Sequence, residues 1–190
     1  IDWHSDIDLE ELEQLLDQEH VVAIGEIGLD YYAKDFNKDR QHFYFEAQVN
    51  MANKYALPVI VHARKSHDDI LHILRNTGFS QGGIMHAFNG SMQQAEVFID
   101  MGFKLGLGGM LTFERSTKLR KLARALPDHA IVLETDAPDM TVASHRGQRN
   151  SPEYLPEVLA SLAEIRNQPV DELAKLTTEN AKMVLRLGDL

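Results

Sequence analysis

The chain has 190 residues, of which 44% are apolar and 25% charged, with no cysteine and a formal net charge of −10. This composition indicates one globular domain and excludes disulfides, thiolate catalysis and zinc sites with cysteine ligands. The negative charge argues against a broad basic surface for duplex DNA, and no apolar stretch approaches the ~20 residues that cross a bilayer. We expect a cytoplasmic monomer without membrane contacts.

Helical and strand patterns alternate along the chain, which predicts an α/β fold with a parallel sheet. A leucine stripe indicates a first helix, and a long loop after the first strand is typical of a functional segment. The predicted elements, in chain order, are a helix at 8–19, a strand at 21–25, a loop at 26–37, a helix at 39–55, a strand at 58–61, a helix capped by Ser66 and ended by Gly78, a strand at 83–85, a helix at 91–102, a strand at 103–109, a helix at 116–126, a strand at 131–135, an irregular stretch at 137–150, a helix from 151, and short helices at 170–176 and 179–187.

Local signals accompany three of these elements. Ser66 with Asp69, and Ser91 with Gln94, have the spacing of capping boxes at helix starts. Glycines within the strand at 103–109 indicate that another group approaches the backbone closely there.

Four side chains able to bind a metal come directly after predicted strands: Glu26, His62, His86 and Asp136. Taken singly, a histidine or glutamate at a strand end is as often a structural residue. Because the C-terminal ends of parallel strands meet at one rim, however, we expect the four side chains to lie close together. Two imidazoles and two carboxylates form a ligand set for a divalent cation.

Four segments that contain these residues resemble signatures of the TatD family of metal-dependent deoxyribonucleases. They are GEIGLDYY at 25–32, VHAR at 61–64, MHAFNG at 85–90 and LETDAP at 133–138. The resemblance implies a (β/α)8 TIM barrel, of which this chain covers about the last five strands. Residues 1–190 would then form a single barrel domain that is incomplete at its N-terminus. The family's Asp-x-His-x-His motif is absent from these residues, so a protein limited to them should lose one metal position.

The resemblance also implies a role for each residue. Glu26 resembles the carboxylate that bridges two metal ions, and His62 and His86 resemble ligands of the second metal. Asp136 resembles the ligand of the first metal that also takes a proton from the nucleophilic water, so Asp136 and Glu26 are the expected catalytic residues. The implied cofactors are two divalent ions, Mg, Mn or Zn. The implied substrate is DNA, as single strands or ends, cleaved in the 3′→5′ direction.

Further polar residues near the predicted rim are candidates for substrate contact. Arg64 lies two residues past a candidate ligand, so in a continuing strand it points to the same side and suits a phosphate clamp. Asn89 can donate to a phosphate, Arg146 lies beyond the last strand, and Tyr31 or Tyr32 can stack on a base. The alternatives are a surface ion pair, a turn, a solvated loop and simple packing.

Two other functions remain open at this point. Related barrels use similar ligands to hydrolyse amides, lactones or phosphoesters of small molecules, and the acidic net charge favours such a metal-dependent amidohydrolase or phosphoesterase modestly. The chain can also be a non-catalytic barrel fragment that serves as a binding or structural module.

Overall fold

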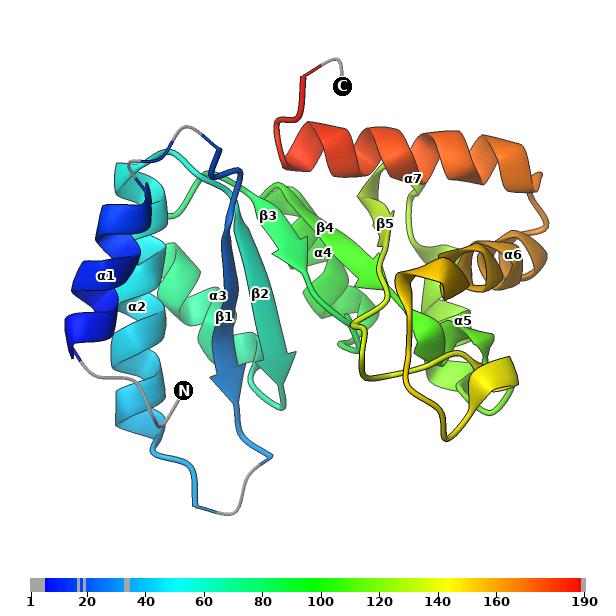
Figure 1. Cartoon of the computed structure of the whole chain (residues 1–190), viewed down its shortest axis with the longest axis horizontal. Coiled ribbons are helices and arrows are strands. Elements are labelled where there is room, and N and C mark those ends of the chain that lie inside the picture. The colour runs from blue at the N-terminus through cyan, green and yellow to red at the C-terminus, as the bar shows by residue number, and fades with distance from the viewer. Residues whose placement is uncertain (1–5, 17, 19, 33–34, 189–190) are drawn as a thin grey trace.

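The computed structural model describes residues 6–16, 18, 20–32 and 35–188. Among these residues, five parallel strands form one sheet in the order β1-β2-β3-β4-β5, so each strand pairs with its successor in the chain (Figure 1). The predicted α/β fold with a parallel sheet is confirmed. The strands are β1 Ile24–Asp30, β2 Val59–Arg64, β3 Gly83–Met85, β4 Phe103–Leu107 and β5 Ile131–Leu133.

Helices connect the strands and pack against the sheet (Figure 1). None of the helices in the described part of the chain combines the length and apolar character needed to span a membrane. The α-helices are α1 Asp6–Leu16, α2 Lys38–Lys54, α3 His67–Asn76, α4 Met92–Asp100, α5 Thr117–Ala125, α6 Leu155–Arg166 and α7 Val170–Val184, and the 3-10 helices are η1 Gly109–Thr112, η2 Asp128–Ala130, η3 Ala143–His145 and η4 Pro152–Tyr154.

Side chains alternate between the two faces of each strand, as the period of two in a strand requires. In β2, Val59, Val61 and Ala63 are buried in the hydrophobic core. The side chains of His62, which lies between Val61 and Ala63, and of Arg64, the last residue of the strand, point to the opposite face. The same alternation separates the apolar face of the sheet, which packs against helices, from a face that carries polar side chains.

Four of the five predicted strands have wrong boundaries, and those of β1 and β2 affect candidate ligands. Glu26 lies inside β1, which continues to Asp30, so the predicted loop at 26–37 starts too early. His62 likewise lies inside β2, which continues to Arg64. The glycines around Glu26 suggest a turn by sequence alone. In the structure, Gly28 is needed because a Cβ there would lie 2.0 Å from the carbonyl oxygen of His62 on the neighbouring strand. β4 ends at Leu107 and β5 at Leu133, each two residues earlier than predicted.

The predicted break in the last helical region is also wrong. Residues 170–184 form the single helix α7, whereas two short helices were expected. Two consecutive threonines in this region weaken the helical pattern. The hydroxyl of Thr177 donates to the carbonyl of Leu173 at 2.8 Å, one turn back in the same helix, so its polar group is satisfied without interrupting the helix.

Of the two predicted capping boxes, one is confirmed and one is wrong. Ser91 and Gln94 form the reciprocal side-chain and backbone hydrogen bonds at the start of α4. Ser66 is the N-terminal cap residue of α3 but makes no capping bond. Its buried hydroxyl instead donates to the carbonyl of Leu29 at 2.6 Å and so ties the end of β1 to the start of α3.

A buried imidazole, His67, lies at the start of α3. It is 8% exposed, its ring packs edge-on against Phe88 with 5.4 Å between centroids, and its Nε2 has no partner among the described residues. Burial lowers the pKa of His67. Because the unfolded chain then binds a proton at higher pH than the folded chain does, the free energy of unfolding decreases as the pH falls below the unfolded pKa of about 6.5.

We expect His67→Leu to reduce this sensitivity to acid. Urea unfolding at pH 8 and pH 5.5 should show that the wild-type protein loses up to about 1.4 kcal/mol per pH unit through this group, and that the variant loses less. His72→Leu, which changes an exposed histidine on the same helix, is the control and should keep the wild-type slope. Equal pH slopes in the wild type and His67→Leu would contradict the prediction.

Candidate metal centre

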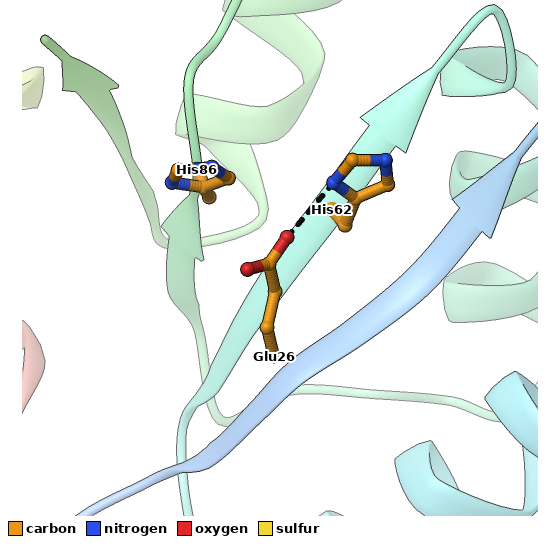
Figure 2. Close-up of side chains that lie close together, drawn as sticks. All are labelled: Glu26, His62 and His86. Carbon is orange, nitrogen blue, oxygen red and sulfur yellow. Dashed lines mark hydrogen bonds and ion pairs between the residues drawn. The ribbon is translucent and has the colours of Figure 1, made fainter. Parts of the chain in front are cut away.

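Three of the four predicted ligands converge on the polar face of the sheet. Glu26 comes from β1, His62 from β2 and His86 from the residue directly after β3 (Figure 2). Each offers one ligand atom, and the three atoms lie within 4.8 Å of one another. One carboxylate oxygen and two imidazole nitrogens at this separation fit a divalent cation that accepts nitrogen and oxygen ligands, such as zinc or manganese.

Glu26 and His62 are directly hydrogen-bonded. His62 Nδ1 lies 2.8 Å from Glu26 Oε1, and this bond raises the pKa of His62 and lowers the pKa of Glu26 (Figure 2). The pair therefore holds a proton between an imidazole and a carboxylate. A histidine must be neutral to bind a metal, so cation binding at these two groups releases that proton.

Each imidazole also faces a second carboxylate. Asp30, at the end of β1, places Oδ2 at 3.2 Å from His62 Nε2. Glu134 lies 3.0 Å from His86 Nδ1 and also accepts the backbone N–H of Ala87 at 2.8 Å. The hydrogen bond with Glu134 raises the pKa of His86 to about 9. Such outer carboxylates fix the orientation of metal-binding imidazoles and increase their basicity.

Asp30 and Glu134 are site residues that were not predicted from the sequence. A signal was present, because Asp30 lies four residues after Glu26 and Glu134 lies two residues before Asp136. In extended backbone, even spacing places side chains on the same face. The strand at Glu26 was predicted to end too early for this spacing to be used.

Asp136 lies beside the cluster, with Oδ1 at 3.5 Å from His86 Nε2. Burial raises the pKa of its carboxyl group. Asp136 has a left-handed backbone with φ of 57°, a conformation that costs about 1–2 kcal/mol for a residue other than glycine. The side chain of Asn150, which is 1% exposed, donates to the carbonyls of Thr135 and Asp139 at 2.6 Å each and so holds the turn that carries Asp136.

The predicted substrate-contact residues differ in their surroundings. The guanidinium of Arg64 stacks on the ring of Tyr32, with 3.5 Å between Cζ and the ring centroid. Tyr31 is half-buried, and its hydroxyl donates to Asp69 at 2.7 Å. Asn89 and Arg146 are exposed. Within residues 20–32 and 35–188, no hydrogen bond or ion pair joins either of them to the three converging ligands.

Gly106 on β4 makes room for Glu134, which confirms that a group approaches this strand closely. A Cβ at residue 106 would lie 2.2 Å from Glu134 Oε2. We therefore expect Gly106→Ala to displace Glu134 from His86 and to weaken Zn²⁺ binding about tenfold or more, as measured by calorimetry. Gly188→Ala, at a glycine with open space around it, is the control. Unchanged Zn²⁺ affinity in Gly106→Ala would show that Glu134 does not support the cluster.

Comparison with known sequences identifies related proteins. Residues 1–186 match the family described as "TatD related DNase". The chain is 42% identical over 182 residues to the protein named "Uncharacterized metal-dependent hydrolase YjjV" from Escherichia coli K12, and the match covers 95% of this chain and 70% of that protein. It is 37% identical over 196 residues to the protein named "Uncharacterized metal-dependent hydrolase YabD" from Bacillus subtilis, covering 99% of this chain and 77% of the relative.

Solved structures give a matching result. The crystal structure of E. coli YjjV, described as a TatD homologue, superposes with a TM-score of 0.92 at 40% identity and covers 98% of this chain and 73% of that chain. A TatD family hydrolase from Entamoeba histolytica superposes with a TM-score of 0.78 at 23% identity, covering 96% of this chain and 69% of that chain. The second structure shares the fold.

Proposed function

The chain belongs to the TatD family of metal-dependent hydrolases, and on that premise we propose that it hydrolyses phosphodiester bonds in DNA. The proposed reaction is 3′→5′ exonucleolytic cleavage of single strands or DNA ends with two divalent cations, Mg²⁺, Mn²⁺ or Zn²⁺. The observation that carries the proposal is the convergence of Glu26, His62 and His86, in which each imidazole has a second carboxylate behind it.

In this proposal, Glu26, His62, His86 and Asp136 hold the cations. When bound, such cations lower the pKa of a coordinated water and stabilise the charge on the phosphate in the transition state. Asp30 and Glu134 keep the two imidazole rings in place. Asp136 accepts the proton of the attacking water, and its raised pKa suits a carboxylate that takes up a proton during the reaction.

We also propose that the five strands form part of a (β/α)8 TIM barrel. Among the described residues, the edge strands β1 and β5 each have one strand partner, whereas every strand of a closed barrel has two. The polar face of the sheet, which carries Glu26 and His62, is then the barrel interior at its C-terminal rim. A crystal structure of the protein tests this arrangement, and a sheet whose two edges have no further strand partner would contradict it.

The nuclease proposal is tested with metal-free protein to which one divalent cation is added at a time. A single-stranded oligonucleotide labelled at its 5′ end should shorten progressively from the 3′ end, and Glu26→Ala should abolish this shortening. The proposal fails if the wild-type protein releases no nucleotide with any of the three cations. It also fails if Glu26→Ala matches the wild type.

A second candidate function is the hydrolysis of a small molecule by the same metal centre, as an amidohydrolase or phosphoesterase. The net charge of −10 favours this function, because it opposes the approach of a long polyanion. Assays with p-nitrophenyl phosphodiesters and with acylated aromatic amines distinguish the possibilities. Turnover of the amide alone would replace the phosphodiesterase proposal.

A further inference from the structure

Two positively charged side chains beside the candidate metal centre lie over one aromatic ring. Arg64 Cζ lies 3.5 Å and Lys65 Nζ 5.1 Å from the centroid of the Tyr32 ring, and Tyr32 is 58% exposed. We call Tyr32, Arg64 and Lys65 the rim platform. The ring attracts both cations through its negative face and restricts their motion while leaving them in contact with solvent.

Neither cation of the rim platform has an ion-pair partner within the described residues. Two other basic side chains, at the two ends of α2, do have ion-pair partners. Lys38 pairs with Asp69 at 2.8 Å, and Lys54 pairs with Glu13 at 2.6 Å. In a chain with a net charge of −10, cations that remain unpaired next to acidic groups are available for an external anion. The guanidinium has N–H donors in the fork geometry that matches a phosphate.

The rim platform is fixed relative to the metal centre through β1 and β2. Arg64 follows His62 by two residues in β2, so both side chains lie on the same face about 6.6 Å apart along the strand. Asp30 links the two groups, since Oδ2 lies 3.2 Å from His62 Nε2 and Oδ1 accepts the backbone N–H of Tyr32 at 2.8 Å. One carboxylate therefore positions both a ligand imidazole and the platform ring.

We propose that the rim platform binds the phosphate next to the scissile phosphate of a nucleic-acid strand. This inference rests on the proposed phosphodiesterase function and adds a second, non-reacting phosphate as a requirement for full activity. Arg64 donates two N–H groups to this phosphate and Lys65 adds a charge. Tyr32 is a positioning residue that holds the guanidinium flat. A substrate with a single phosphate gains far less from the platform.

The test compares two substrates that differ in this second phosphate. With added Mn²⁺, Arg64→Gln should lower kcat/KM for an oligothymidylate by about ten- to a hundredfold, the loss expected for hydrogen bonds to a charged group. The same variant should lower kcat/KM far less for bis(p-nitrophenyl) phosphate, which has one phosphate. Arg75→Gln removes an exposed arginine from the last turn of α3 and is the matched control for charge.

Substitutions of Tyr32 and the dependence of binding on salt concentration test the rim platform independently. Tyr32→Leu should lower kcat/KM for the oligothymidylate alone, and Tyr32→Phe, which keeps the ring, should restore it. The dependence of oligothymidylate binding on salt should also weaken in Arg64→Gln, with the slope of log K against log[salt] falling by about 0.7 for one lost phosphate contact. Thermal unfolding checks that each variant is folded, and Lys65→Gln replaces Arg64→Gln if the latter is not.

The outcomes separate this inference from the function on which it rests. If the wild type cleaves both substrates and Arg64→Gln affects both equally or neither, the platform inference is overturned and the phosphodiesterase proposal stands. Cleavage of bis(p-nitrophenyl) phosphate without cleavage of the oligothymidylate overturns the platform inference and favours a small-molecule substrate. If the wild type cleaves neither, both proposals are overturned.

Discussion

Replacement of Glu26 by alanine is expected to lower hydrolytic turnover by about a thousandfold or more, because it removes the carboxylate that faces both imidazoles of the candidate metal centre. The loss has two causes. The variant binds the cation more weakly, and His62 loses the hydrogen bond that it makes with Glu26. Turnover of the best substrate found in the assays above, with the cation added in excess, measures this effect. Bound metal per chain, determined by mass spectrometry after dialysis, should fall in parallel.

The control for this prediction is Glu46→Ala, which removes an exposed carboxylate from α2. It should retain wild-type turnover and metal content. Wild-type activity in Glu26→Ala would mean that hydrolysis does not use the cluster. Normal metal content with lost activity would instead assign Glu26 to the reaction alone.

Gly28→Ala is expected to destabilise the protein by about 3 kcal/mol or more. The added Cβ would lie 2.0 Å from the backbone oxygen of His62, and the residue has a φ of +148°. Relief of this overlap requires β1 to move away from β2, so the hydrogen bonds between the two strands are strained together with the Glu26–His62 contact. Urea unfolding of the variant and of the wild type at the same pH measures the change in the free energy of unfolding.

Gly78→Ala separates strain of the backbone from steric overlap. Gly78 also has a positive φ, of +62°, but an added Cβ there meets nothing within 4 Å. The free energy of unfolding of this variant should decrease only by what an alanine in the left-handed conformation costs, about 1–2 kcal/mol. If Gly28→Ala were no more destabilised than Gly78→Ala, close approach of the two strands would not be what requires glycine at residue 28.

The parallel sheet could be predicted from the sequence because its signals are local. Each strand is a short apolar run that is buried on the face toward the helices, and each helix has its own period and stop residues. His86 follows its strand directly, as predicted, and the capping box of Ser91 and Gln94 depends on residues three positions apart. Such features do not require knowledge of which distant segments are neighbours.

The features that were missed depend on contacts between distant segments. The glycine at residue 28 looks like part of a turn until β2 is known to pass beside it, so β1 was ended too early. Ser66 has the pattern of a cap, yet its hydroxyl donates to Leu29. Glu134 acquires its role only when β4 and β5 pair and bring it beside His86. Local sequence patterns contain no information on these pairings.

The position of Asp30 between His62 and the backbone N–H of Tyr32 has a consequence for how ligands affect one another. An ion that orders the His62 ring would also order Asp30, and through Asp30 the segment that carries the Tyr32 ring next to Arg64. We therefore expect cation binding at the candidate metal centre and anion binding at the rim platform to be heterotropically linked. By thermodynamic reciprocity, the factor by which the cation tightens the anion equals the factor by which the anion tightens the cation.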